Sequence, residues 1–146
     1  MSNKYASHLS AVARIEIRFN ECDPLGIVWH GNYANYFQEG REAFGKKYNL
    51  DYMRIYIQGF ATPIVHLSSD FKQTLQYKDV ALVETVMRKT DAAKIIFDYT
   101  IRNEKDDTIV CKGTTTQVFV TSGTMNLSLI VPEVYLDWKK QIARAH

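Results

Sequence analysis

A turn followed by a long helix carries the residues best placed to do chemistry. The chain turns at Asp23-Pro24-Leu25-Gly26 and enters a helix-like run near His30. Proline at the second position and glycine at the fourth favour a type I turn, and the residue before proline is held extended. Few acidic residues fall in the first helical turn. The positive N-terminal end of the helix is therefore free to meet an anion or a developing negative charge.

Other reactive side chains in the sequence do not form a recognisable catalytic site. His66, Ser68 and Ser69 do not make a serine–histidine site, because no nucleophile elbow surrounds them and alternation places Ser69 on the opposite face. Cys22 has no recognisable base partner. Asp23 has a commoner role than catalysis, which is to accept a hydrogen bond within its own turn. The turn alone leaves both roles of Asp23 open.

Three polar residues near the helix start have structural interpretations. We expect Asn32 to cap the helix, which is the default for asparagine at that place. The imidazole of His30 is expected to pack or to form hydrogen bonds, and general-base catalysis is the alternative. Glu39 is interpreted as a solvated or interface residue, again with catalysis as the alternative.

The long helix is predicted from the spacing of its apolar residues. Gly40 lies inside the apolar stripe, where it lowers helix propensity, so another backbone is expected to pass close to it. The stripe has one residue every three or four positions, as in an amphipathic helix. Its members are Tyr33, Phe37, Gly40, Phe44 and Tyr48.

Five strands are expected to accompany this helix. One precedes it, and four follow it with short connections, which makes those four an antiparallel meander. One long helix packed on a curved antiparallel sheet is an α+β fold, and the edge strands of such a sheet invite pairing with a second copy. A further helical turn is expected within residues 51–58 and a short terminal helix from Pro132 to Ile142. The predicted strands are residues 11–19, 64–77, 80–89, 94–102 and 108–121.

The composition is that of one globular domain. A chain of 146 residues can build its own core, so residues 1–146 are assigned to one domain, with the polar residues 1–10 expected to be flexible. Apolar residues make up 46% and charged residues 23%, which are ordinary values. A net charge of +2 does not indicate a nucleic-acid partner.

The cysteines and the hydropathy bear on the compartment. Cys22 and Cys111 lie far apart with no CxxC pattern, which favours a reduced, cytoplasmic protein. No apolar run is long enough to span a membrane, and the start of the sequence lacks the apolar core of a signal peptide.

The turn and the helix start resemble a known family. The run D-P-L-G-I-V from Asp23, followed by Trp29, His30 and Asn32-Tyr33, is similar to the 4-hydroxybenzoyl-CoA thioesterase family of hotdog-fold proteins, which includes the Tol-Pal-associated acyl-CoA thioesterases. The later runs SSDFKQTLQYKDVALVET and GTTTQVFVT resemble that family's later strands. The resemblance extends over roughly residues 13–137.

The resemblance implies a fold, an assembly and a reaction. The fold would be a hotdog, a curved antiparallel five-stranded sheet wrapped around one long helix. The assembly would be a homodimer or homotetramer that hydrolyses acyl-CoA thioesters at the subunit interface. Asp23 matches the catalytic aspartate, acting as nucleophile or general base. His30 matches the residue whose backbone N–H polarises the thioester carbonyl, and Gly31 supplies the next amide. Neither a metal nor a cofactor is expected, because CoA is part of the substrate and a thiolate leaves readily.

Two alternatives remain beside the thioesterase. A hotdog hydratase or dehydratase would act on an acyl thioester, but such enzymes usually carry a histidine with an aspartate or glutamate, and no matching motif is present. A non-catalytic module that binds acyl thioesters would keep the pocket and tolerate loss of Asp23. The preferred acyl group, and the choice between CoA and acyl carrier protein, stay open.

Overall fold

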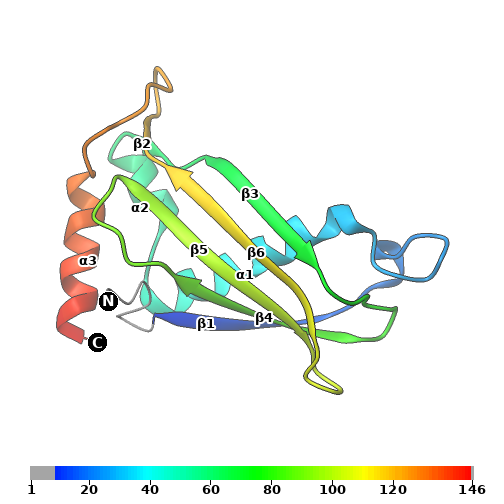
Figure 1. Ribbon diagram of the computed structural model, residues 1–146. Coiled ribbons are helices and arrows are strands. Elements are labelled where there is room, and N and C mark those ends of the chain that lie inside the picture. The colour runs from blue at the N-terminus through cyan, green and yellow to red at the C-terminus, as the bar shows by residue number, and fades with distance from the viewer. Residues whose placement is uncertain (1–8, 146) are drawn as a thin grey trace.

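The structure is a computed structural model that describes residues 9–145. A five-stranded sheet and one long helix form its centre, and two shorter helices and a two-stranded sheet lie around them (Figure 1). In chain order the elements are β1 (Ser10–Glu16), η1 (Phe19–Glu21), η2 (His30–Asn32), α1 (Tyr33–Tyr48), α2 (Tyr52–Ile57), β2 (Phe60–Ala61), β3 (Ile64–Phe71), β4 (Val80–Met87), β5 (Lys94–Asn103), β6 (Ile109–Val118), β7 (Val120–Thr121) and α3 (Glu133–Ala145).

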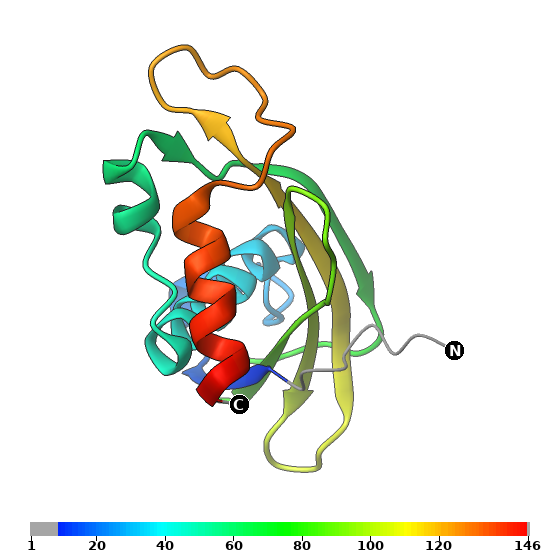
Figure 2. The ribbon, with the colours of Figure 1, turned by 90° about the vertical axis from the view of Figure 1, so that its left-hand side faces the viewer.

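The five-stranded sheet has the order β1-β4-β5-β6-β3, and every neighbouring pair is antiparallel. The predicted four-stranded meander was wrong in one strand. Only β4, β5 and β6 are consecutive neighbours, with Val83 of β4 opposite Ile101 of β5 and Tyr99 of β5 opposite Gly113 of β6, whereas β3 pairs with β6 and not with β4. The first strand and β3 are the two edges. The long helix α1 runs along one face of the sheet (Figures 1 and 2). The predicted α+β fold is confirmed.

The apolar stripe of α1 builds the core against this sheet. The ring of Phe37 is fully buried and stacks on Tyr99 with centroids 4.3 Å apart. The ring of Phe44, also fully buried, meets Phe97 edge-on at 5.0 Å. Burial of each such ring stabilises the fold by about 2–3 kcal/mol. The spacing seen in the sequence therefore describes the helix face that the sheet covers.

Gly40 marks the closest approach of α1 to the sheet. A Cβ placed on Gly40 would overlap the hydroxyl of Thr85 and come within 3.0 Å of a methyl group of Val83. The close neighbour is therefore a pair of side chains on β4, whereas the sequence led us to expect a backbone.

The strand β3 ends at Phe71, although the prediction carried it to residue 77. The amides of the next two residues both donate to the carbonyl of Val110, at 2.7 and 3.1 Å, and the ladder stops there. Leu75 is buried beyond that point, and its carbonyl accepts the amide of Val28 at 2.8 Å. The alternation after Phe71 thus belongs to a loop that supports the segment before α1.

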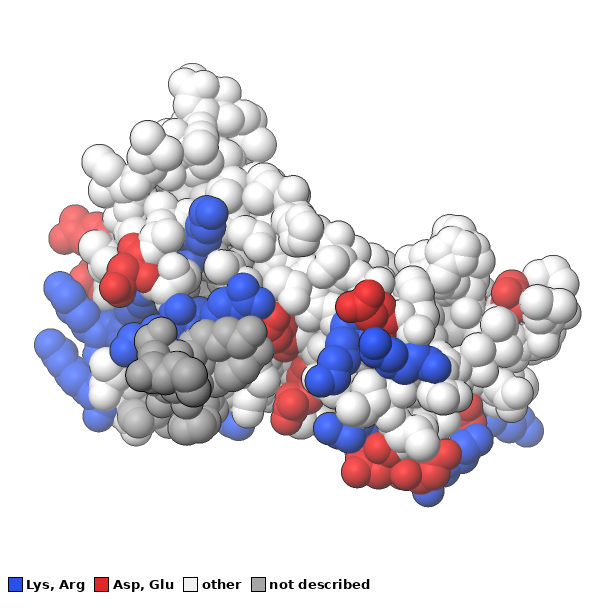
Figure 3. All heavy atoms as spheres, in the orientation of Figure 1, with Lys and Arg blue, Asp and Glu red and all other residues white. Residues whose placement is uncertain are grey.

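The predicted last strand, residues 108–121, is divided into β6 and β7. After the buried Phe119 the chain leaves the main sheet, and Thr121 pairs with Phe60 of β2. Residues 55–69 and 113–132, which include the two strands of this small sheet, contain no Asp, Glu, Lys or Arg. Figure 3 shows the result as an uncharged projection at the upper left of the molecule.

The ends of the described chain are packed. Leu9 is buried and Ser10 opens β1, so order begins before residue 11; residues 1–8 and 146 lie outside the described residues. The C-terminal helix α3 buries Trp138, whose indole Nε1 donates to the carbonyl of Tyr48 at 2.8 Å. Both cysteines are free thiols. None of the described helices is long and apolar enough to cross a membrane.

Candidate active site

The segment between β1 and α1 folds into a closed turn. The amide of Asp23 donates to the carbonyl of Ile27 at 2.8 Å, and the amide of Gly26 donates back to the carbonyl of Asp23 at 2.9 Å. Gly26 has a φ of +82°, which glycine adopts without strain. The predicted four-residue turn is present, and it holds Asp23 at its first position.

The carboxylate of Asp23 is anchored by one oxygen. Its Oδ1 accepts the amide of Leu25 at 2.8 Å, which is the local turn bond that the sequence left open. The other carboxylate oxygen has no hydrogen-bond partner among residues 9–145. Asp23 is half-buried. The turn bond therefore orients the side chain and leaves one oxygen for a ligand.

The start of the helix is fastened to the same loop through Glu21. The carbonyl of Glu21 accepts the amide of Trp29 at 3.0 Å and Nδ2 of Asn32 at 2.8 Å. Asn32 stands at the cap position of α1, but its side chain makes no capping bond. Our prediction of a cap was wrong because Asn32 has helical angles, φ −78° and ψ −14°, whereas a capping side chain requires an extended residue.

Two backbone amides are left unpaired where the helix begins. The amides of His30 and Gly31 have no hydrogen-bond acceptor in the described part of the chain, while the next amide, that of Asn32, donates to the carbonyl of Trp29 at 2.9 Å. No acidic residue lies in the first turn of η2 or of α1. Unpaired amides at a helix start are fixed donors for a negatively charged oxygen.

Trp29 is a residue of this site that the sequence analysis did not assign a role. Its indole lies directly against Gly31, where a Cβ would overlap the ring, and its centroid is 5.1 Å from that of the His30 imidazole. Half of its surface is exposed (51%). The tryptophan two residues before a glycine could have indicated this contact, because only glycine lets a ring lie this close to the backbone.

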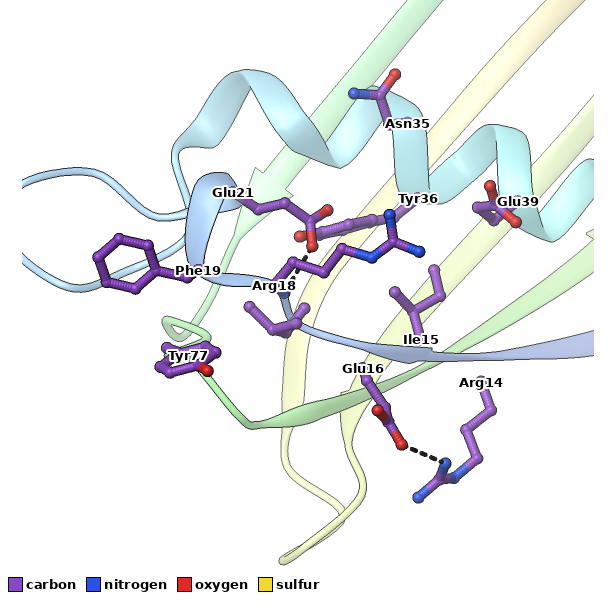
Figure 4. A pocket seen from close by; sticks show the side chains of 11 residues that line it. Arg14, Ile15, Glu16, Arg18, Phe19, Glu21, Asn35, Tyr36, Glu39 and Tyr77 are labelled. Carbon is purple, nitrogen blue, oxygen red and sulfur yellow. Dashed lines mark hydrogen bonds and ion pairs between the residues drawn. The ribbon is translucent and has the colours of Figure 1, made fainter.

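A polar groove of about 550 Å³ lies beside this segment, between β1, η1 and α1 (Figure 4). Arg18 donates its amide to the carboxylate of Glu21 at 2.7 Å, and the buried hydroxyl of Tyr36 faces that carboxylate. Burial, and then the charge of Glu21, raise the pKa of Tyr36. Glu39 lines the same groove and is exposed, as its interpretation as a solvated residue requires. Asp23 does not line this groove.

The sheet, the long helix and the unpaired amides at its start define a class of protein, the hotdog-fold thioesterases. The sequence pattern of the thioesterase-like superfamily matches residues 17–138, and the chain belongs to that superfamily.

Relatives and solved structures agree with this assignment. A Bacillus subtilis (strain 168) protein, YneP, whose name describes it as a candidate acyl-CoA thioesterase, is 30% identical over 131 residues, 90% of this chain and 94% of the relative. The 4-hydroxybenzoyl-CoA thioesterase of Pseudomonas sp. (strain CBS-3) is 27% identical over 83% of this chain and 91% of its own length. The structure of a Staphylococcus aureus DHNA-CoA thioesterase superposes with a TM-score of 0.83 at 25% identity, covering 93% of this chain and 90% of that one.

Proposed function

We propose that the protein hydrolyses an acyl-CoA thioester to the free acid and CoA. Asp23 acts as nucleophile or general base, and the amides of His30 and Gly31 bind the thioester oxygen. The observation that carries the proposal is the pair of unpaired amides at the start of α1, one loop away from a carboxylate with a free oxygen, in a chain of the thioesterase-like superfamily.

The proposed chemistry follows from the charge that develops during attack. As a bond forms to the thioester carbon, negative charge grows on the carbonyl oxygen, and two fixed amides stabilise it. In the nucleophilic route the free oxygen of Asp23 bonds to that carbon, CoA leaves as the thiolate, and water hydrolyses the mixed anhydride. In the general-base route Asp23 takes a proton from water, which attacks the carbon directly. Both routes need the orientation that the amide of Leu25 gives to the carboxylate.

We also propose that a second copy completes the site. Asp23 and His30 line none of the grooves described in this protomer, so bound substrate would meet solvent there. The edge strand β3 exposes Ile64, Val65 and Leu67, with 40–61% of each residue's surface accessible. An unpaired edge with apolar side chains is a surface for pairing with another strand. A homodimer, or a homotetramer built from it, would cover this edge. The free thiols agree with a cytoplasmic setting.

Release of free thiol from a panel of short-chain, long-chain and aromatic acyl-CoAs tests the proposal. We expect turnover with at least one substrate and a fall of about 100-fold or more in kcat for Asp23→Asn, the scale of losing a main catalytic group. Asp91→Asn, at an exposed turn far along the chain, is the matched control and keeps the rate.

The outcomes separate the alternatives. A mutant with the wild-type rate removes Asp23 from the mechanism. Binding of acyl-CoAs without any thiol release favours the non-catalytic module. An acyl adduct on the peptide that contains Asp23, detected by rapid quench and mass spectrometry, selects the nucleophilic route.

A further inference from the structure

A second groove, of about 690 Å³, lies between α1, α2 and the end of β6. Uncharged side chains form much of its wall, among them Leu50, Tyr52 and Met53. A groove of this volume with apolar walls can hold a hydrocarbon chain.

Arg41 stands at the wall of this groove without a counter-ion. Its Nη1 donates to the hydroxyl of Tyr99 at 3.0 Å, and that hydroxyl shares a 2.6 Å hydrogen bond with Thr115. Within residues 9–145 this is the guanidinium's one hydrogen bond, and no carboxylate forms an ion pair with it. A guanidinium has five N–H donors. The half-buried side chain of Arg41 therefore offers unused donors and an uncompensated charge to the groove.

Neutral polar groups lie beside this cation. Gln117 donates its Nε2 to the carbonyl of Thr62 at 2.9 Å, and the hydroxyl of Tyr52 comes within 3.5 Å of Oε1 of Gln117. Burial raises the pKa of Tyr52, against the lowering effect of the Arg41 charge, so the hydroxyl stays protonated. The polar end of the groove thus joins one cation to uncharged groups.

The charged groups at the rim balance, with two cations and two carboxylates. Lys46 and Arg54 stand there with Glu42 and Asp51, and Asp51 already accepts the backbone amides of Met53 and Arg54, at 2.9 and 3.4 Å. The charge of Arg41 is therefore the one that sets the preference of the groove for an anion.

The groove lies along α1, and the unpaired amides lie just before the start of that helix. Residues at spacings of three and four lie on the same face of an α-helix. Arg41 follows Ala34, in the first turn of α1, by seven positions, about 10 Å along the axis, and His30 lies just before α1 in η2. Ala34 and Gln38, which lie on that face before Arg41, are exposed. A chain bound by its carbonyl at the helix start can therefore run along α1 to Arg41.

We propose that this groove receives the far end of the acyl group and that Arg41 binds a carboxylate there. The inference rests on the proposed function and names its substrate class, the CoA thioesters of long-chain dicarboxylic acids. The planar guanidinium and the carboxylate pair through two parallel hydrogen bonds, which no methyl-ended chain can form. The uncharged walls contact the methylene groups between the two ends of the acid.

Matched substrate pairs test the proposal through kcat/KM. The pairs are octanedioyl-CoA with octanoyl-CoA, dodecanedioyl-CoA with dodecanoyl-CoA, and hexadecanedioyl-CoA with hexadecanoyl-CoA. We expect the wild type to prefer the dicarboxylic member of at least one longer pair by about tenfold or more, the scale of a hydrogen bond to a charged group. Arg41→Met should abolish the preference while still cleaving the methyl-ended member, and Arg41→Lys should keep part of it. Arg144→Met, at an exposed position of α3 outside the groove, is the matched control and keeps the full preference.

A binding measurement separates failure of this inference from failure of the proposed function. Free dodecanedioic and dodecanoic acids are titrated calorimetrically into the wild type, Arg41→Met and Arg41→Lys, each first shown by thermal melting to be folded. Tighter binding of the diacid that depends on Arg41 supports the groove even if no thioester is cleaved. Equal binding of the two acids, or equal kcat/KM within every pair, overturns the inference and leaves the hydrolase untouched.

Discussion

The contact between Trp29 and Gly31 sets the geometry of the proposed oxyanion donors. The indole lies where the backbone of Gly31 passes, and the amide of Trp29 is fixed on the carbonyl of Glu21. The position of the two unpaired amides therefore depends on a side chain as well as on the backbone path. A small change at either residue should move the donors relative to Asp23.

Gly31→Ala is expected to lower kcat by about tenfold or more, with a small effect on Tm. The added methyl group overlaps the Trp29 indole, so either the ring or the amides must shift, and loss of one oxyanion donor costs about 100-fold or more. Thiol release measures the effect. In a Trp29→Ala background the same substitution should be much less harmful, because the overlapping ring is gone. Equal losses in the two backgrounds would show that the indole does not position the amides.

Some features of the candidate site can be predicted from neighbouring residues in the sequence, and others depend on residues far apart in the chain. The turn at Asp23 and the helix start near His30 were predicted correctly, because a proline turn and a helix boundary depend on adjacent residues. The roles of Asp23 and His30 in the site came from the family resemblance and stay predictions. Asn32 was misassigned because its hydrogen bond goes to Glu21, eleven positions earlier, and no local rule specifies that pairing. Arg41 gave no signal, since an arginine on an amphipathic helix is ordinary until its lack of a partner is seen in three dimensions.

Among the helices and strands, the sequence predicts features that depend on a repeating pattern and misses those that depend on pairing between distant segments. The spacing in α1 predicted the buried face correctly, because a helix repeats its own geometry along its length. The length of β3 was overestimated because Leu75 continues the alternation into a loop, where it is buried for another reason. The chain divides into β6 and β7 because β7 pairs with β2 over two residues. So short a pairing produces no alternating pattern in the sequence.

Gly40→Ala is expected to lower the free energy of unfolding by about 1–3 kcal/mol, the usual penalty for overpacking a core. The added methyl group meets the Thr85 hydroxyl and Val83, and this outweighs the better helix propensity of alanine, about 1 kcal/mol. Urea denaturation followed by circular dichroism gives the value. The double substitution Gly40→Ala/Thr85→Ala should recover part of the loss. Gly123→Ala, where an added Cβ meets nothing, is the control, and an equal loss there would refute the packing explanation.

At the scale of the whole molecule, two neighbouring surfaces could pair with a second copy: the edge strand β3, which exposes apolar side chains, and the uncharged projection beyond it. Residues 55–69, which include much of β3, carry no Asp, Glu, Lys or Arg. The sequence indicated an edge that invites pairing but not which edge, because strand order depends on contacts between distant segments. In the structure β3 exposes Ile64, Val65, Leu67 and Phe71, whereas the other edge, β1, exposes Val12 among its large apolar side chains.

Leu67→Asp is expected to convert a dimer into a monomer and to reduce thioester hydrolysis with it. A charge in the centre of an apolar strand pair is strongly unfavourable, whereas Leu67 is already exposed in the single protomer, so the fold should survive. Light scattering after size-exclusion chromatography gives the mass. Val12→Asp, on the opposite edge strand β1 where Val12 is also exposed, should leave the dimer intact. A monomeric wild type, or a Leu67→Asp variant that stays dimeric, would count against pairing through β3.

The unpaired amides at the start of α1 belong to the peptide chain itself, and this affects how the protein can be dissected. Replacing His30 by alanine removes an imidazole and keeps the N–H that the chemistry is proposed to need. A systematic alanine scan would therefore identify Asp23 as essential and would not detect the proposed contribution of the two backbone amides. The contribution of these amides to the rate can be measured only by changing the backbone, for example by an ester bond that replaces the N–H of Gly31 with oxygen.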